Sequence, residues 1–300
     1  MSLLNPAFAH ENVRYRDGKR YAWFVSLLVP TVLGCGPLFY VLTDSVASLF
    51  MPALLVYGAI PLLDLLLGED RNNPPEEVVP LLEADAYYRW ATYALVPVLW
   101  LAFLGNADFV GTRSLPWFGV LAIAMNTGIL CGFAINLGHE LGHKKSKLER
   151  NLATAVLSMG AYGHFAIEHY GLLRQKRANG LYERCQPHHS WNSNHACSNW
   201  ATYHLQRHSD HHANPGRRYQ SLRHFDGLPS LPNGYFGMFL VALVPSLWFR
   251  VMDPLLLAHT EGSPERINFD PKRRAALCAR YGLEDAQALE QTGAAARAAA

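Results

Sequence analysis

Long apolar runs with almost no charged residues dominate the first half of the chain. Four of them are separated by short polar loops: Tyr21–Leu42, Ala47–Leu67, Trp90–Leu104 and Trp117–Leu137. A helix of about 20 apolar residues spans the hydrocarbon core of a bilayer. Trp90–Leu104 is shorter than the others, but apolar neighbours can extend it at either end. The pattern predicts an all-α integral membrane protein built on a bundle of transmembrane helices.

Prolines lie inside these runs, at Pro30, Pro37, Pro61 and Pro97. In a soluble helix each would remove a backbone hydrogen bond, whereas in a membrane bundle the neighbouring helices can satisfy the freed groups. The prolines therefore agree with membrane helices.

Basic residues gather before the first run and after the fourth: Arg14, Arg16, Lys19, Arg20, Lys144, Lys145, Lys147 and Arg150. The loop after the first run carries Asp44 and no Lys or Arg, and the loop before the fourth run carries only Arg113. By the positive-inside rule, the N-terminus and the segment that follows the fourth run are cytoplasmic.

The second half of the chain is more polar. Asn151–His169 predicts a further helix, and Tyr235–Phe249 is apolar but too short for an ordinary span, which favours an interfacial or re-entrant segment. We therefore divide the chain into three parts: residues 1–169 form the bundle, residues 170–260 a cytoplasmic histidine-rich cap with the short apolar segment, and residues 261–300 a C-terminal tail.

Composition narrows the possible functions. The net charge is +2, and the chain has no basic stripe with interleaved aromatic residues, so we exclude nucleic acid as a partner. None of the five cysteines forms a C-x-x-C pair. The chain therefore has no rubredoxin-type iron site and no zinc ribbon of its own.

Histidines carry the candidate chemistry, and eight of the fourteen fall between His169 and His212. Further upstream, His139 and His143 are four residues apart at the end of the fourth run. That spacing puts both imidazoles on one face of a helix, where one metal ion can bind both.

A second group occurs in His208-Ser209-Asp210-His211-His212. On a helix His208 lies one turn from His211 and His212, and these two diverge enough to serve two different ions. Asp210 is a candidate to hold the second ring nitrogen of a ligand. Both groups follow segments expected at the cytoplasmic face, so we predict a metal-binding cap there. Isolated histidines such as His10 and His259 predict ordinary packed or solvated side chains.

The donor set of imidazoles with few carboxylates suits iron, zinc, copper or nickel. His139-Glu140-Leu141-Gly142-His143 also matches the HExxH signature of zinc proteases, in which Glu140 would be the general base. An intramembrane zinc protease is therefore an alternative. It would need a distal carboxylate ligand, for which Asp226 is the candidate, and it leaves the second histidine group without a role.

Longer strings extend the pattern over nearly the whole chain. They are Gly68-Glu69-Asp70-Arg71-Asn72-Asn73-Pro74-Pro75-Glu76, His139 to Lys145, Tyr170 to Leu172, His188-His189-Ser190-Trp191-Asn192-Ser193, Leu205 to Ala213, and Leu228-Pro229 with Leu231-Pro232 and Gly234-Tyr235. In these strings the chain resembles the membrane-bound alkane monooxygenases, which are relatives of the fatty acyl desaturases and hydroxylases.

One part of the family pattern is missing. The family has a middle histidine box of the form EHxxGHH, then two more membrane helices, and then a second Glu-His before Tyr-Gly-Leu. Here Glu168-His169 runs directly into Tyr170-Gly171-Leu172. The sequence predicts that the stretch from one Glu-His to the next is absent, so His169 stands for one of two family ligands. A catalytically impaired metal-binding remnant is therefore a further alternative.

The resemblance implies a di-iron enzyme that hydroxylates the terminal methyl of an alkane drawn from the bilayer. It would use dioxygen, with electrons from a separate rubredoxin that a NAD(P)H-dependent rubredoxin reductase reduces. A related fatty acyl hydroxylase or desaturase is the closest alternative. The implied location is the bacterial inner membrane, with the histidines on the cytoplasmic side. The implied ligands of the two iron ions are His139, His143, His169, His208, His211 and His212. Basic residues that could dock an acidic electron donor are Arg174, Lys176, Arg177, Arg217 and Arg218.

Overall fold

A computed structural model describes residues 5–160, 190–264, 267 and 273–284. The chain divides into two compact units, residues 1–240 and 241–300. The first unit begins with a small antiparallel hairpin of β1 (Phe8–His10) and β2 (Val13–Tyr15), in which Phe8 lies opposite Tyr15. Helices make up most of the rest. The three-part division of the chain stays a prediction.

The first apolar run forms two helices instead of one. They are α1 (Val25–Gly34), which follows a 3-10 turn (Ala22–Phe24), and α2 (Gly36–Thr43). The two segments are bent by 51° at Cys35. Pro37 lies in the first turn of α2, where its missing N–H is unneeded, so it starts a new helix there. The span predicted for Tyr21–Leu42 is therefore broken.

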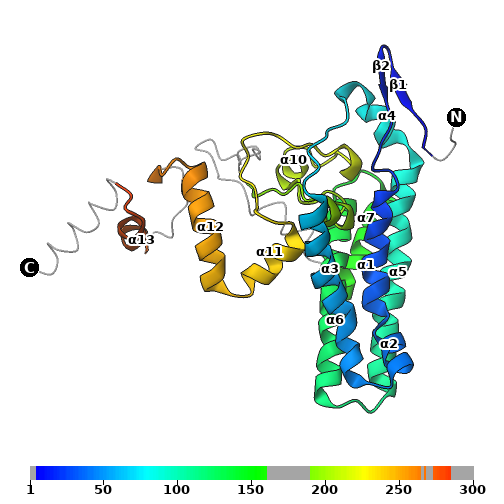
Figure 1. Cartoon of the computed structure of the whole chain (residues 1–300). Helices are drawn as coiled ribbons and strands as arrows, with labels where there is room; N and C mark the ends of the chain where they lie inside the picture. Colours follow the sequence, from blue (N-terminus) through cyan, green and yellow to red (C-terminus); the bar gives the residue numbers. More distant parts are fainter. Residues whose placement is uncertain (1–4, 161–189, 265–266, 268–272, 285–300) are drawn as a thin grey trace, which may run out of the picture. The chain divides into compact units, whose positions relative to one another are not determined.

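Three further helical segments are long and apolar enough to cross a membrane: Val46–Leu67, which contains α3 (Met51–Leu67), α5 (Ala86–Thr112) and α6 (Trp117–Gly142). They lie side by side with α1 and α2 in Figure 1. α5 is longer than the run Trp90–Leu104 suggested. Asp85 caps its start by accepting the Tyr87 N–H at 2.9 Å, and this fixes the extra turn.

Small residues let the helices approach closely. A Cβ at Gly34 would lie 2.8 Å from the Ala102 side chain, which brings α1 against α5. A Cβ at Gly138 would lie 2.6 Å from Leu157. Gly138 therefore seats α7 (Lys147–Leu157) against the last turns of α6, where His139 lies. α7 starts earlier than the predicted helix Asn151–His169, and a 3-10 turn follows it (Ser158–Gly160).

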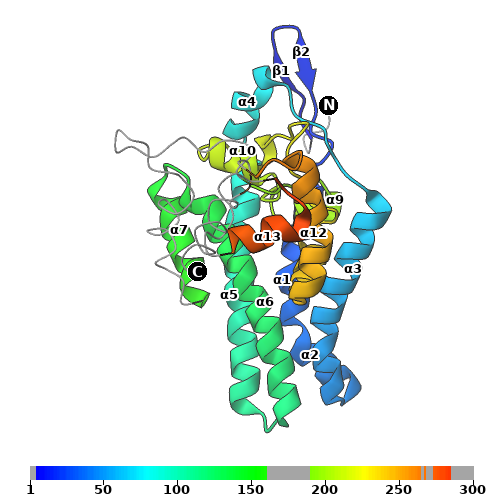
Figure 2. The same cartoon turned by 90° about the vertical axis from the view of Figure 1, so that its left-hand side faces the viewer.

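Short elements gather at the α10 end of the bundle (Figures 1 and 2): a 3-10 turn (Glu76–Val78), α4 (Val79–Ala84), α9 (Ala196–Ala201), α10 (His208–Ala213) and a second 3-10 turn (Tyr219–Ser221). Asp64, in the last turn of α3, fastens this cap. Its buried carboxylate accepts the Ser198 N–H at 2.9 Å and also the Ser198 hydroxyl. α9 is thereby tied to the end of a membrane-type helix.

The last apolar run is also broken. It is divided between α11 (Tyr235–Ala242) and α12 (Pro245–His259), because Val244 leaves the helical conformation before Pro245 starts the second helix. Within the part of the chain that the structure describes, neither helix is long enough to count as a span. The second unit continues to α13 (Arg274–Tyr281), where the Tyr281 hydroxyl donates a hydrogen bond to Asp253 of α12.

Candidate metal centre

The first two candidate ligands stand at the end of α6. The helix continues past the apolar run to Gly142, and His143 is its C-cap residue. His139 and His143 are one turn apart, with ring centroids 4.9 Å from each other. The predicted i, i+4 pair therefore does share a helix face.

The second group is carried by α10, a helix of six residues. Its His208 and His212 are also one turn apart, with Nε2 atoms 2.8 Å from each other. Between them His211 points at α6: its Nε2 lies 3.0 Å from the Nε2 of His139. Two short segments that are far apart in the sequence thus bring five imidazoles together.

The tightest group comprises His139, His143 and His211, whose ligand atoms all lie within 4.8 Å of one another. With metal–nitrogen bonds of about 2.1 Å, nitrogens as close as those of His139 and His211 would subtend about 90° at a shared ion. That is the angle between adjacent ligands of an octahedral metal. The ring of His212 lies 5.7 Å from those of both His139 and His211, so the two groups adjoin.

The donor set fits a metal ion. His211 is completely buried, and burial, together with the neighbouring imidazoles, lowers its pKa well below the usual value. It is therefore neutral near pH 7, which is the form that binds a metal. Its Nδ1 has no hydrogen-bond partner within the described part of the chain. Five of the six predicted ligands thus lie in one cluster, and His169 falls outside the described residues. Their role as ligands stays a prediction.

Glu140 is placed differently from the general base of a zinc protease, which must face metal-bound water. Its carboxylate forms a buried ion pair with Lys144 at 3.0 Å and accepts the Tyr219 N–H at 3.4 Å. The proposed distal ligand Asp226 is 96% exposed and contacts His224. These contacts disfavour the protease interpretation.

Asp210 does not take the role suggested for it. Its buried carboxylate accepts hydrogen bonds from Asn214 at 2.7 Å, from Arg217 at 3.1 Å and from the Arg223 N–H at 2.9 Å. These contacts hold the loop after α10 against the helix. The expectation that Asp210 holds a ring nitrogen is wrong, because the arginines that follow α10 fold back onto it.

The basic residues suggested as a docking surface are also engaged. Arg217 pairs with Asp210, and Arg218 pairs with Glu149 at 2.8 Å, so both side chains are less than a fifth exposed. Arg174, Lys176 and Arg177 lie outside the described residues. Both of these charges are therefore already paired within the chain, and the docking of a partner protein on this surface stays a prediction.

An apolar cavity of about 490 Å³ borders His139. Its walls come from α3, α6, α11 and the segment after α9: Tyr57, Met125, Gly128, Ile129, Gly132, Phe133, Ile135, Asn136, His139, Thr202, Leu205, Tyr235, Phe236 and Phe239. On α6 the glycines Gly128 and Gly132 are one turn apart, and a Cβ at either would meet nothing within 4 Å. An apolar path to the metal site was expected, but its lining residues other than His139 were not identified from the sequence, although the spacing of Gly128, Gly132, Asn136 and His139 was a signal for them.

The fold and the cluster define a class: a helical protein with membrane-type spans that gathers histidine ligands around a candidate metal site at one end of its bundle. Comparison with known proteins makes this specific. A search of family models finds none that matches the chain. Curated proteins do match it. The alkane 1-monooxygenase of Ectopseudomonas oleovorans is 35% identical, over 94% of this chain and 96% of that protein.

Two further relatives have the same name. The alkane 1-monooxygenase of Pseudomonas putida is 36% identical, over 87% of this chain and 91% of that protein. Alkane 1-monooxygenase 1 of Alcanivorax borkumensis is 34% identical, over 94% of this chain and 96% of that protein. The chain therefore belongs to the alkane 1-monooxygenase family, and it is an enzyme of this kind.

The alignments are longer than the chain. The one with the Ectopseudomonas oleovorans protein extends over 390 residues, whereas this chain has 300, so at least 90 aligned positions have no counterpart here. This excess agrees with a gap inside the chain. The position expected for that gap is Glu168-His169, where the resemblance predicts the middle histidine box, and it stays a prediction.

Proposed function

We propose that the chain hydroxylates the terminal methyl group of alkanes, using dioxygen and two electrons. The observation that carries the proposal is that an apolar cavity borders His139, a member of the histidine cluster. A hydrocarbon has no polar group to recognise, so an apolar cavity beside a metal site is the arrangement that its oxidation requires. The names of the relatives support the same reaction.

We propose two iron ions as the cofactor. His139, His143 and His211 would hold one of them, and His208, His212 and His169 would take part in holding the other. When bound, iron supplies the redox chemistry that activates dioxygen, a task that zinc cannot perform. The imidazoles would hold the metal beside the cavity that His139 lines. The C–H bond offers no acid–base handle, so we assign no general base.

The lining of the cavity favours an unmodified hydrocarbon over a fatty acyl substrate. None of the described lining residues is Lys or Arg. A carboxylate or an acyl thioester head would therefore find no cationic partner, whereas an alkyl chain needs none. Alkanes dissolve in the bilayer and would enter between the helices.

Electrons must come from outside the chain, because it has no C-x-x-C pair. We propose a separate rubredoxin as the donor, reduced by a NAD(P)H-dependent reductase. Since these are soluble proteins of the cytoplasm, the proposal requires the histidine end of the bundle to face the cytoplasm, in a bacterial inner membrane.

That topology gives the first prediction. A single cysteine placed at Lys147, beside the start of α7, is expected to react with a membrane-impermeant maleimide only after the inner membrane is opened. The matched control is a cysteine at Arg113, in the loop between α5 and α6, which should react in intact spheroplasts. Labelling of the Lys147 site alone from the outside would reverse the topology and exclude a cytoplasmic donor.

The cavity gives the second prediction. Gly132 and Gly128 lie seven and eleven residues before His139, or about 10 and about 16 Å along the helix axis. Gly128→Leu is therefore expected to lower the turnover of dodecane by about tenfold while leaving hexane nearly unaffected, and Gly132→Leu is expected to lower both. Gas chromatography of the alcohol products is the measurement.

Gly105→Leu on α5 is the matched control, because Gly105 is also a helical glycine with nothing within 4 Å of its Cβ position but does not line the cavity. It should keep the wild-type substrate profile. Equal effects of the three substitutions would show that the cavity does not hold the substrate.

The function itself is tested by purifying the chain, measuring iron and zinc by plasma mass spectrometry, and assaying 1-octanol from octane with rubredoxin, reductase and NADH. Iron together with 1-octanol supports the proposal. One zinc per chain with no iron would support the protease alternative. The same assay is made on this chain and on a chain in which the absent segment is restored. If both bind iron and neither forms 1-octanol, the chain is a metal-binding remnant.

A further inference from the structure

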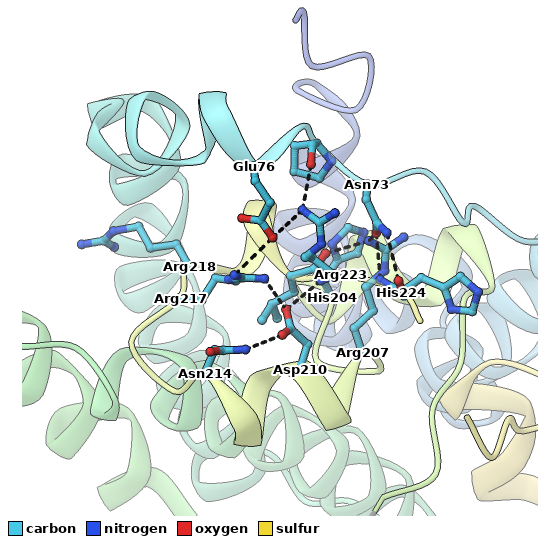
Figure 3. A network of polar contacts seen from close by, with 12 residues as sticks. Asn73, Glu76, His204, Arg207, Asp210, Asn214, Arg217, Arg218, Arg223 and His224 are labelled. Atoms are coloured by element: carbon cyan, nitrogen blue, oxygen red, sulfur yellow. Dashed lines mark hydrogen bonds and ion pairs between the residues drawn. The ribbon is translucent and has the colours of Figure 1, made fainter. Parts of the chain in front are cut away.

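Arg207 is a buried cation at the start of α10. The residue is only 1% exposed and directly precedes His208. Its guanidinium donates hydrogen bonds to the carbonyl oxygens of Asp70 and Leu222, each at 2.7 Å. It also donates one to the Asn73 side chain at 3.2 Å (Figure 3). Burying a charge is costly unless its donors are satisfied. The two terminal nitrogens carry these contacts, whereas Nε has no hydrogen-bond partner among the described residues, so the cation is held through its outer edge.

Most of these oxygens belong to residues 70–76, the polar segment after α3. Asp70 forms an ion pair with Lys19 at 2.7 Å, which ties the segment to the chain before the first helix. Asn73 clamps the backbone of His224, accepting its N–H at 2.8 Å and donating to its carbonyl at 2.9 Å. The segment is thus fixed at Asp70 to the chain before the first helix and at Asn73 to the loop after α10.

A second contact joins the far end of the same segment to α10. Glu76 pairs with Arg223 at 2.9 Å and lies 3.7 Å from Arg217. Both arginines also bind Asp210, Arg217 through its side chain and Arg223 through its N–H. Figure 3 shows Glu76 and Asp210 on opposite sides of these arginines. Residues 70–76 therefore contact α10 at two points. One is Arg207, just before its first residue, and the other is Asp210, near its middle, which Glu76 reaches through Arg217 and Arg223.

α10 needs contacts from outside to fix its conformation and direction, because an isolated helix of six residues is not stable by itself. Its imidazoles must nevertheless meet those of α6, with His211 within 3.0 Å of His139. A rotation of α10 by one residue would turn His211 away from α6, since successive side chains on a helix point in different directions.

We propose that residues 70–76 act as a template that orients α10, and that Arg207 is the principal positioning residue for the imidazoles of His208, His211 and His212. The inference rests on the proposed metal-binding function. Lysine cannot replace Arg207, because one ammonium group cannot reach oxygens that the planar guanidinium contacts on several sides. Nothing in this role requires Arg207 to touch metal or substrate.

Arg207→Lys and Glu76→Ala test the proposal in the full-length chain. Cobalt(II) is the probe, because its ligand-field bands report the arrangement of its ligands as well as its binding. We expect Arg207→Lys to weaken cobalt binding by about tenfold and to shift the bands, as other losses of groups that orient ligands do. Glu76 is 57% exposed, so Glu76→Ala should cause a smaller loss, about threefold, with a shift in the same direction.

The control is Arg71→Ala, in the same segment. Arg71 is 64% exposed and pairs only with Glu69 among the described residues, so this variant should bind cobalt as the wild type does, with the same spectrum. Thermal unfolding of the metal-free chains separates lost positioning from lost stability, because destabilisation alone leaves the bands of the folded fraction unchanged.

Wild-type affinity and bands in Arg207→Lys would overturn the proposal. Should that variant fail to fold, wild-type behaviour of Glu76→Ala would overturn it. A wild-type chain that binds no metal would refute the proposed function itself, and this inference with it.

Discussion

His143→Ala is expected to remove most of the iron from the purified chain, and so are His139→Ala and His212→Ala. His139 and His143 lie in the group whose ligand atoms are within 4.8 Å of one another, and His212 pairs with His208 at 2.8 Å. Even the loss of a group behind a ligand costs about 10–100-fold in metal affinity, so the loss of a ligand itself should cost more. Iron content after identical purification is the measurement.

His10→Ala and His259→Ala are the matched controls. His10 ends a strand of the N-terminal hairpin, and His259 ends α12 in the second unit. Neither belongs to the cluster, so both variants should keep the wild-type iron content. If His143→Ala also keeps it, the face of α6 that carries this pair does not bind the metal.

Restoring the absent segment after His169 is expected to raise both the iron content and the octane turnover of this chain, which by itself should hold fewer than two irons and hydroxylate alkanes poorly. The reason is the number of ligands. Five imidazoles meet in the described cluster, and the family pattern adds a Gly-His-His pair and a second Glu-His that this sequence does not contain. A metal site that lacks ligands holds its ion weakly.

The comparison requires the short and the restored chains side by side, each measured for iron by mass spectrometry and for 1-octanol by gas chromatography. A restored chain in which the added histidines are replaced by alanine is the control, because it returns the helices without the ligands. If the short chain carries two irons and turns over octane as fast as the restored one, the local histidines suffice and the gap is not damaging.

Several features followed from the sequence because they depend on local spacing. Apolar run length predicted membrane-type helices, and three segments of the described chain have the required length and hydropathy. The i, i+4 spacing placed His139 and His143 one turn apart, since a helix repeats every 3.6 residues. The family also followed from the sequence, because the motif strings indicated it and relatives 34–36% identical to the chain are alkane 1-monooxygenases by name.

Other features depended on partners that are distant in the sequence. Asp210 was expected to support an imidazole, yet Arg217 and Arg223 occupy its carboxylate. The same folding-back pairs Arg217, one of the suggested docking residues, with that carboxylate. Spacing along the chain indicates which side chains share a face of a helix. It does not indicate which groups from distant segments pair with a buried carboxylate.

The sequence by itself determined that this protein has membrane-type helices, two histidine groups and a place in the alkane 1-monooxygenase family, since each depends on residues near one another in the chain. Only the tertiary structure decided that His211 meets His139, that the cavity beside Gly128 and Gly132 borders the cluster at His139, and that Arg207 is buried beside oxygens of residues 70–76. The physical reason is that a six-residue helix has no preferred direction of its own. The packing of α10 against segments 72 to 137 residues away in the sequence sets it.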